Sequence, residues 1–265
     1  MSLRGLWQVV ASWTFTLVFA ACASVITLVT LGRFARRLTP WLLRFWGQHM
    51  LRLAGITYET QGTEHLLTDS MKVVTFNHGS LIDAYLVTAI MPPASVAAIK
   101  REALYYPMVG ITLYLLGFLL IDRGAGGRAR KVMNRAAARM ADEKLAVFLA
   151  PEGTRHLVAE LLPFKKGALH LAVASQAPIV PMLIDGAFEL HGPGRLTSIP
   201  GHVIIRFLPP RPTAGLGSES VGAETEALRA HYTSELSRLR ADRLAAGLGL
   251  QAPSTPARAG SGAAG

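Results

Sequence analysis

The chain has 265 residues, of which 51% are hydrophobic and 17% are charged, a composition that excludes an intrinsically disordered protein. Lys and Arg number 27 against 17 Asp and Glu, which gives a formal net charge of +10, and the only cysteine is Cys22. One cysteine excludes an intrachain disulfide framework and a cysteine-based zinc site. A basic excess on an apolar chain favours membranes with anionic lipid over nucleic acid as the partner.

The first predicted element is an uncharged run from Gly5 to Leu31. A helix of this length can cross a hydrocarbon core of about 30 Å, and Trp7 and Trp13 lie toward one end, as interfacial anchors often do. A cleaved signal peptide, with a weak cleavage or lipidation site at Ala21-Cys22-Ala23, is the competing interpretation. Arginines directly after the run oppose translocation. We therefore expect residues 1–32 to be a transmembrane anchor, with the rest on the cytoplasmic face of the inner membrane.

Residues 33–56 predict an amphipathic helix with a basic face. Its polar stripe contains Arg37, Arg44, Gln48 and Arg52, and its apolar stripe consists of Leu38, Leu42, Phe45, Trp46, His49 and Leu53. Six arginines and one acidic residue in positions 1–60 favour a helix lying among anionic lipid headgroups. An ordinary surface helix packed on the core is the alternative. A nucleic-acid surface is disfavoured, because no recognition motif accompanies the charge.

Short apolar strands then alternate with helical stretches. Strands are predicted at 72–76, 96–99, 118–121, 146–149, 178–184 and 203–208, and helices at 81–91, 107–116, 128–144 and 167–175. This alternation indicates an α/β domain over residues 57–215, with helices covering a sheet. A charged amphipathic helix within 216–250 and a disordered tail at 251–265, rich in Pro, Ala, Gly and Ser, complete the chain.

The first candidate for chemistry follows the strand at 72–76. His78 and Asp83 are five residues apart, which in a regular helix would separate them by about 140°. An irregular turn at Gly79-Ser80 can bring them together, because glycine bends freely and serine can cap the next helix. Asp83 could then accept a hydrogen bond from one imidazole nitrogen and leave the other as a base. The alternative is a turn histidine beside a solvated aspartate.

Further candidates follow two other strands. Arg123 brings a guanidinium to the sheet edge, although a strand-end salt bridge is a common alternative. In the string 151–155, Gly153 permits close backbone approach, Thr154 can bond oxygens, and Arg155 can grip a phosphate. The sequence has no Gly-x-Ser-x-Gly elbow, Walker loop or His-Glu-x-x-His helix. A base and anion-binding residues without a covalent nucleophile suit direct transfer to a substrate hydroxyl.

Four strings together resemble the glycerolipid acyltransferases, in particular the 1-acylglycerol-3-phosphate acyltransferases. They are Asn77-His78-x4-Asp83, Gly117-x3-Ile121-x-Arg123, Pro151-Glu152-Gly153-Thr154-Arg155 and Val180-Pro181-Met182. They occur in family order over about residues 55–210, behind a basic, two-part membrane N-terminus. Two positions depart from the family pattern: Leu120 stands where Phe is usual, and His156 where serine often follows the third string.

The resemblance implies a glycerol-3-phosphate acyltransferase-like sheet and a mechanism. His78, oriented by Asp83, would take the proton from the sn-2 hydroxyl of lysophosphatidic acid, which then attacks the thioester of acyl-CoA or acyl-carrier protein to give phosphatidic acid. The substrate-binding residues that the resemblance implies are Arg123, Glu152, Gly153, Thr154, Arg155 and Lys100. Glu152 is expected to bond a glycerol hydroxyl or brace an arginine. No metal and no cofactor beyond the acyl co-substrate is expected.

Two other functions remain open from the sequence. The same motifs serve acyltransferases that act on another lysolipid, such as a lyso-ornithine lipid or lysophosphatidylglycerol. The other candidate is a catalytically inactive, membrane-anchored lipid-binding module, against which the intact His78 and Asp83 pair argues.

Overall fold

A computed structural model describes residues 2–30, 35–68, 71–121, 126–154 and 160–247. Its centre is a seven-stranded sheet with the order β1-β7-β6-β2-β5-β3-β4. All neighbouring strands are parallel except β6 and β7, which are antiparallel. The strands are β1 (Ile56–Gln61), β2 (Lys72–Phe76), β3 (Ser95–Lys100), β4 (Leu119–Ile121), β5 (Ala146–Leu149), β6 (Ile179–Asp185) and β7 (Gly201–Phe207).

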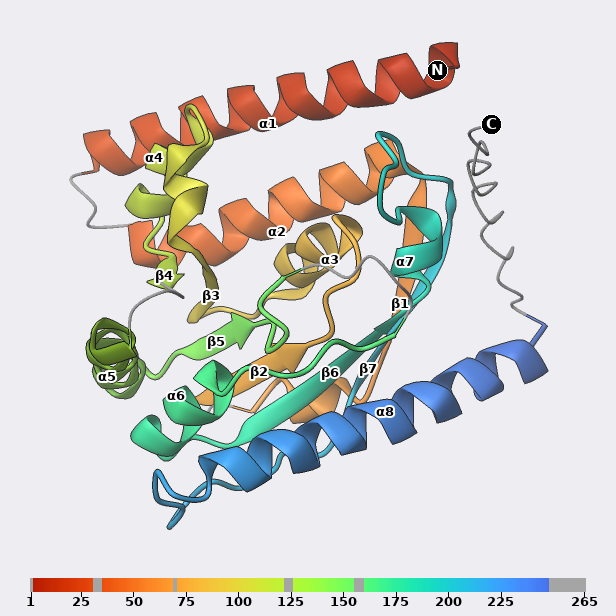
Figure 1. Ribbon diagram of the computed structural model, residues 1–265. Coiled ribbons are helices and arrows are strands. Elements are labelled where there is room, and N and C mark those ends of the chain that lie inside the picture. Colours follow the sequence, from red (N-terminus) through yellow and green to blue (C-terminus); the bar gives the residue numbers. More distant parts are fainter. Residues whose placement is uncertain (1, 31–34, 69–70, 122–125, 155–159, 248–265) are drawn as a thin grey trace, which may run out of the picture.

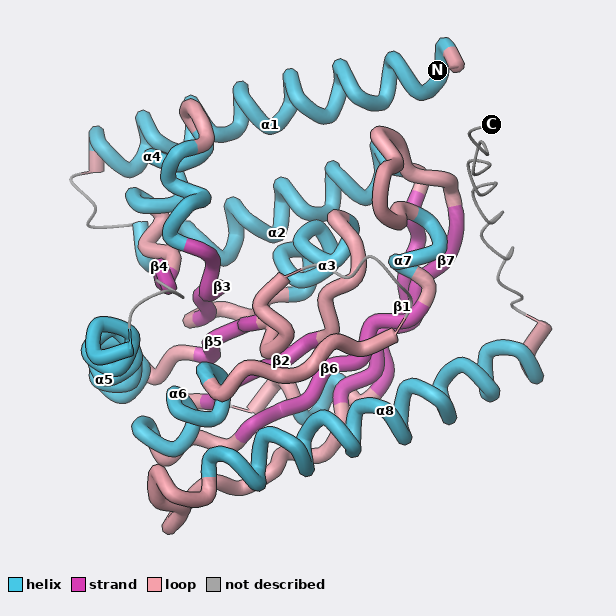
Figure 2. Tube along the Cα trace, viewed as in Figure 1, coloured by secondary structure: helices cyan, strands magenta, loops and turns pink. Residues whose placement is uncertain are grey.

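Helices cover both faces of the sheet (Figures 1 and 2). On one face lie α2 (Ala35–Ala54) and α3 (Ile82–Ile90), and on the other α5 (Gly126–Glu143), α6 (Gly167–Ser175) and α8 (Val221–Ala245). Successive strand residues point to opposite faces, so Val74 and Phe148 pack with α2 and α3, whereas Val73 and Val147 pack with the other three helices. Both faces being covered explains why β2, β5 and β6 are buried along their whole length.

The N-terminal helix α1 (Leu3–Val29) forms an additional layer over α2 and α4 (Val109–Leu115) (Figure 1). Its inward side is partly polar: the Thr16 hydroxyl accepts a hydrogen bond from Trp46 Nε1 at 3.2 Å, and the Ser24 hydroxyl lies 2.9 Å from that of Thr112. Its outward side exposes large apolar residues, including Leu6, Trp7, Val10, Trp13, Val18 and Val25. Among the described helices, α1 is long and apolar enough to cross a membrane.

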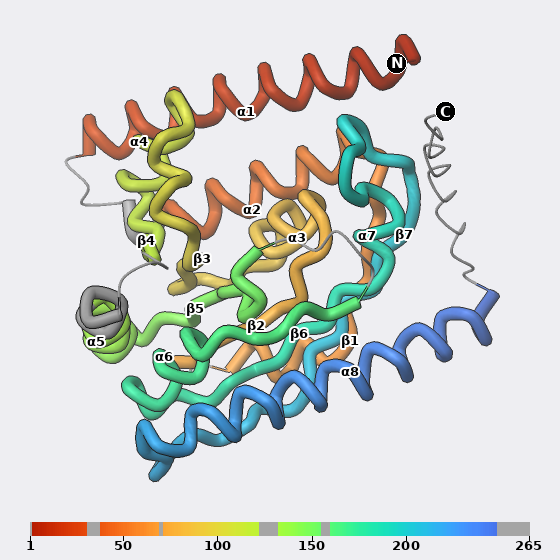
Figure 3. Tube along the Cα trace, viewed as in Figure 1, coloured from red at the N-terminus to blue at the C-terminus, as the bar shows by residue number. Residues whose placement is uncertain are grey.

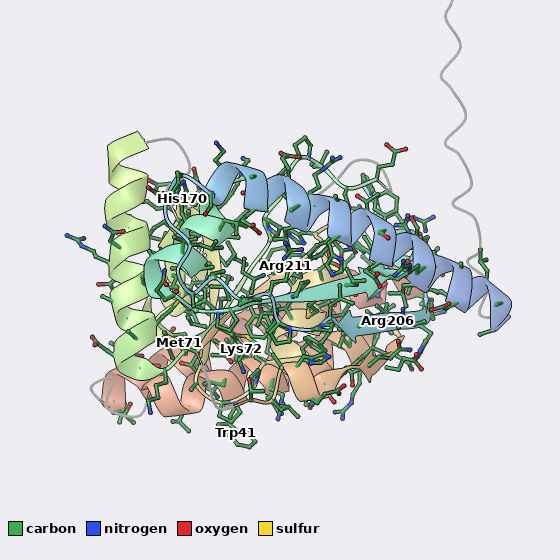
Figure 4. All side chains as sticks on the ribbon, turned by 90° about the horizontal axis from the view of Figure 1, so that it is seen from below. Trp41, Met71, Lys72, His170, Arg206 and Arg211 are labelled. Atoms are coloured by element: carbon green, nitrogen blue, oxygen red, sulfur yellow. The ribbon has the colours of Figure 1, made fainter. Side chains whose placement is uncertain are left out.

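The second helix, α2, packs closely on α3. A Cβ added at Gly47 would lie 2.4 Å from Thr88 Oγ1, so only glycine permits this approach. Phe45 and His49, both on the predicted apolar stripe, contact the Phe15 ring of α1, and Phe45 remains 49% exposed. Trp41 is 59% exposed and projects from α2 (Figure 4). The helix itself is thus confirmed and is part of the core, while its position among headgroups stays a prediction.

Most of the predicted elements occur within a few residues of their expected bounds, but the sheet edge differs. The strand β1 was not predicted separately, because only Ile56 of its six residues is buried. It lies beside β7, although 139 residues lie between the end of β1 and the start of β7 (Figure 3). Ile56 pairs with Gly201 at one end of the two strands, and Gln61 pairs with Arg206 at the other. Short helical segments, also not predicted, are η1 (Thr63–His65), η2 (Arg101–Tyr105) and α7 (Ala187–Leu190). The predicted tail at 251–265 lies outside the described residues.

The last helix, α8, is attached to the sheet along its length. Near its start, Glu224 Oε2 accepts a hydrogen bond from Arg211 Nη2 at 3.2 Å, and near its end Asp242 Oδ2 accepts one from Arg206 Nη2 at 3.0 Å. Both arginines lie alongside α8 in Figure 4. Asp185, at the end of β6, is buried and forms ion pairs with Arg240 and Arg243 of the same helix. These contacts fix the carboxyl end of β6, which adjoins the candidate site.

Candidate active site

The candidate site begins where β2 ends. His78 follows β2 by two residues, and Asp83 lies in the first turn of α3. The turn between them brings His78 Nδ1 to 3.0 Å from Asp83 Oδ2, which confirms that the irregular turn forms a dyad. The His78 side chain is 24% exposed and that of Asp83 only 2%. Because Nδ1 faces the carboxylate, Nε2 is the nitrogen that can accept a proton from a substrate.

The backbone of the same turn holds Asp83 in place. Its Oδ2 also accepts hydrogen bonds from the backbone N–H groups of Gly79, at 2.9 Å, and Ser80, at 2.8 Å. The Ser80 hydroxyl accepts from the N–H of Ile82 at 3.2 Å, but serine is not the N-cap. The helix begins one residue later than predicted, and its N-cap is Leu81, which makes no side-chain capping hydrogen bond. Three hydrogen bonds to one oxygen fix the orientation of the Asp83 side chain toward the imidazole.

Asn77, the residue before the histidine, is fastened to the neighbouring strand. Its side-chain amide donates to the Ile184 carbonyl at 2.8 Å, and its Oδ1 accepts from the Ile184 N–H at 2.8 Å. This reciprocal pair continues the contact between β2 and β6 beyond the last residue of β2. Asn77 therefore fixes the position at which the chain leaves the sheet, directly before His78.

Glu152 contacts the backbone of His78, and only 1% of the residue is exposed to solvent. One carboxylate oxygen accepts from the backbone N–H of His78 at 2.9 Å, and the other from that of Leu162 at 3.0 Å. Desolvation raises the pKa of Glu152 to about 7, against the lowering effect of these two hydrogen bonds. Both carboxylate oxygens thus contact the backbone, which makes Glu152 a positioning residue for the loop that carries His78. The expected bond to a glycerol hydroxyl or to an arginine stays a prediction.

The other expected residues lie at the same edge of the sheet or outside the described residues. Gly153 has φ of +74°, and the Lys165 side chain passes within 3.0 Å of where its Cβ would be. Thr154 is exposed beside it, and Lys100 is exposed at the end of β3. Since β2, β5 and β3 are parallel neighbours, their carboxyl ends with His78, Glu152 and Lys100 share one edge. Arg123 and Arg155 lie outside the described residues.

Among the residues that the structure describes, no three His, Cys, Asp or Glu side chains are grouped so that they could hold a metal ion. The dyad offers an imidazole with one nitrogen oriented by a carboxylate and the other available as a base. This arrangement suits removal of a proton from an attacking hydroxyl.

Comparisons with known proteins agree with this geometry. A model of the Acyltransferase family matches residues 57–185, which contain β2, α3 and the dyad. The 1-acyl-sn-glycerol-3-phosphate acyltransferase alpha of Mus musculus is 34% identical over 214 residues, 80% of this chain and 75% of that protein. The chain belongs to the 1-acyl-sn-glycerol-3-phosphate acyltransferase family. A plant member, from Limnanthes alba, is 34% identical over 204 residues, 73% of this chain and 72% of that protein.

A solved structure shares the fold of this family member. The 1-acyl-sn-glycerophosphate acyltransferase PlsC from Thermotoga maritima superposes with a TM-score of 0.72, at 23% identity, over 89% of this chain and 97% of that chain. This superposition confirms the predicted α/β fold, and the family model and the relatives confirm the family resemblance and the assignment as an acyltransferase. Within the chain, the long apolar helix α1 with its exposed outward side suits association with a membrane.

Sequence reasoning missed two residues that support the site. The sequence places Asn77 in a motif but predicts no role for it, and it does not mark Tyr232 of α8 as a candidate. The Tyr232 hydroxyl is fully buried, donates to the Thr75 carbonyl at 2.6 Å and accepts from the Met182 N–H at 3.2 Å. No local sequence signal marks Tyr232, because Thr75 and Met182, the residues it bridges, lie far from it in the chain.

Proposed function

We propose that the protein transfers a fatty acyl group from acyl-CoA or acyl-carrier protein to the sn-2 hydroxyl of 1-acylglycerol-3-phosphate, which gives phosphatidic acid for phospholipid biosynthesis. The observation that carries the proposal is the 3.0 Å contact between His78 Nδ1 and Asp83 Oδ2, in a chain of the 1-acyl-sn-glycerol-3-phosphate acyltransferase family. The acceptor is the compound that the names of the relatives contain.

The proposed reaction proceeds by direct attack. His78 Nε2 takes the proton of the acceptor hydroxyl while the hydroxyl oxygen forms a bond with the thioester carbonyl carbon. The imidazolium that forms is stabilised by Asp83, as the buried carboxylate faces Nδ1. Collapse of the tetrahedral intermediate breaks the carbon–sulfur bond, and the imidazolium returns the proton to the leaving thiolate. Each step balances without a metal or a redox cofactor, so none is required by the proposal.

The acceptor phosphate is proposed to lie at the sheet edge next to the dyad. Lys100 supplies a positive charge at the end of β3, and Gly153 and Thr154 offer backbone and hydroxyl groups at the end of β5. Arg123 and Arg155 are proposed to complete this anion site, because guanidinium groups bind phosphate in forked contacts. Glu152 is left out of the binding set, since its carboxylate is buried and bonded to backbone N–H groups.

We further propose that the catalytic domain works on the cytoplasmic face of the inner membrane. Arginine-rich positions after α1 oppose translocation and attract anionic lipid. The acceptor and product both carry acyl chains, and moving a chain into water costs about 0.8 kcal/mol per CH₂. A membrane-associated domain avoids that cost because the lipid tails remain in the bilayer.

A test with a panel of acceptors decides the substrate. Purified protein in vesicles receives acyl-CoA or acyl-carrier protein together with lysophosphatidic acid, lysophosphatidylglycerol or a lyso-ornithine lipid, and thiol release is measured. We expect release with lysophosphatidic acid and phosphatidic acid as the product. A preference for another lysolipid would replace the acceptor in the proposal. Absence of transfer to every acceptor would support a lipid-binding module instead.

Arg155→Ala provides a second test of the acceptor site. If Arg155 binds the acceptor phosphate, this variant raises KM for lysophosphatidic acid by about one to two orders of magnitude, as loss of a charged hydrogen bond costs about 1.5–3 kcal/mol. KM for the acyl donor remains close to that of the unchanged protein. An effect confined to the donor would show that Arg155 belongs to the other substrate.

A further inference from the structure

The sequence contains a second long uncharged run besides the N-terminal one. No charged side chain occurs between Glu102 and Asp122. Such a run is ordinarily core, yet a large part of this one is exposed. We name its exposed large side chains the 105–114 patch. They are Tyr105 (82% exposed), Tyr106 (63%), Met108 (50%), Ile111 (59%) and Tyr114 (67%).

The patch is built on a compact turn between η2 and α4. Met108 has φ of +60°, and the N–H of Gly110 donates to the Tyr106 carbonyl at 2.8 Å. A Cβ at Gly110 would lie 2.0 Å from the Leu104 carbonyl oxygen, so the two short helices are in direct backbone contact. No space remains between them for large side chains. The turn therefore presents its aromatic and apolar side chains outward as a consequence of its geometry.

The patch is joined to α1 by hydrogen bonds. Thr112, the polar side chain in the middle of α4, donates to the Ala20 carbonyl at 3.2 Å and lies 2.9 Å from the Ser24 hydroxyl. Ile111 and Tyr114 remain exposed. Figure 1 shows the turn rising from the end of β3 to the level of α1. The exposed apolar surface of α1 thus continues onto the patch.

We propose that the 105–114 patch is a second membrane contact, which inserts beside α1 at the boundary between lipid headgroups and hydrocarbon. Tyrosine favours this boundary, since its ring is apolar and its hydroxyl can remain hydrated. Lys100 and Arg101, both exposed, precede the patch and can meet anionic headgroups. The uncharged patch is complementary to lipid rather than to an acidic carrier protein, which would favour basic side chains.

A second contact has a consequence for the site. One helix alone allows the domain to rotate about the helix axis, whereas a second contact beside the helix widens the inserted surface and fixes the orientation of the domain on the bilayer. The patch follows β3 directly, so its insertion would hold Lys100 and the edge that carries the dyad close to the headgroups. This inference rests on the membrane association of α1, and it concerns the surface from which the proposed lipid acceptor reaches the site.

Depth-dependent quenching tests the contact. Cys22→Ser removes the only cysteine, and a single cysteine is then introduced by Tyr105→Cys or Tyr114→Cys and labelled with an environment-sensitive fluorophore. Matched controls are Leu67→Cys, before β2, and Leu244→Cys, on α8, whose native side chains are 62% and 63% exposed. The proteins are reconstituted in vesicles of phosphatidylethanolamine and phosphatidylglycerol with spin labels on the acyl chains. We expect quenching at 105 and 114 to exceed that at 67 and 244 several-fold.

Equal quenching at all four positions would overturn the proposal. The proposal would also be overturned if the fluorophores at 105 and 114 were shielded in a way that depends on protein concentration or on added acyl-carrier protein rather than on lipid. The patch would then be covered by a protein. The readout does not require activity. A chain that shows the expected quenching but transfers no acyl group would retain the membrane contact and refute the proposed function.

A comparison of KM for two acceptors is a second test of the 105–114 patch. The double variant Tyr105→Ser with Ile111→Ser should raise KM several-fold for a long-chain acceptor in vesicles and leave turnover of a short-chain, water-soluble lysophosphatidic acid unchanged. Leu67→Ser with Leu244→Ser is the control and should change neither. Equal loss with both acceptors would place these side chains in the fold or the chemistry, contrary to the proposal.

Discussion

At the scale of single residues, Asp83 concentrates three hydrogen bonds on one oxygen, from His78 Nδ1 and from two backbone N–H groups. Asp83→Asn keeps the shape but cannot stabilise an imidazolium and permits the wrong tautomer. We expect thiol release to fall by about 10²–10⁴-fold, with Asp142→Asn on the exposed side of α5 as a control that retains activity. Unchanged turnover of Asp83→Asn would show that the carboxylate is structural.

Glu152 gives the protein a pH-dependent stability. Desolvation raises its pKa from 4.5 to about 7 in the folded chain. Between these values the folded chain binds a proton that the unfolded chain has lost, so the free energy of unfolding falls as the pH rises from about 4.5 through 7. Urea unfolding should show a loss on the order of 3 kcal/mol between about pH 4.5 and pH 8.

The matched variant for this measurement is Glu152→Gln. It has no titrating group at position 152, so its unfolding midpoint should change less than that of the unchanged protein over the same pH range. At the acid end it should be less stable by about 1–3 kcal/mol, because its amide nitrogen cannot accept from a buried backbone N–H. Parallel pH profiles for both proteins would contradict this role of Glu152.

At the scale of elements, Tyr232 shows how α8 supports the sheet. The tyrosine hydroxyl lies between β2 and β6, where it donates to the Thr75 carbonyl and accepts from the Met182 N–H. Tyr232→Phe leaves two buried backbone groups unpaired and should lower the free energy of unfolding by about 1–3 kcal/mol. Tyr105→Phe, at an exposed tyrosine, should change it by less than about 0.5 kcal/mol. Equal effects would show that the Tyr232 hydroxyl contributes nothing to the ladder.

The elements also show what the sequence could and could not predict. Strands such as Ala146–Leu149 were predictable because they are buried on both faces and appear as apolar runs. The edge strand β1 was not, because five of its residues are not buried. The turn at Gly79-Ser80 was predictable from local chemistry. The role of Glu152 was not, since its partners, His78 and Leu162, are brought to it by tertiary structure.

At the scale of the whole molecule, one layer holds a large share of the exposed apolar side chains. They lie on α1, on α2 at Trp41 and Phe45, and on the 105–114 patch. Apolar contacts are insensitive to ionic screening, whereas exposed charges are screened within about 3 Å in 1 M salt. Washing membranes with about 1 M salt should therefore leave the protein in the membrane fraction, and detergent should release it. Release by salt alone would mean that the arginines, rather than the apolar layer, hold the protein.

The most direct test of the central claim, that His78 is the base of an acyl transfer, is thiol release by His78→Ala in vesicles. The account predicts a loss of about 10²–10⁴-fold with membrane association retained, because α1 and its contacts are untouched. His65→Ala, in η1 on a different part of the chain, should keep its activity. Turnover by His78→Ala equal to that of the unchanged protein would contradict the account.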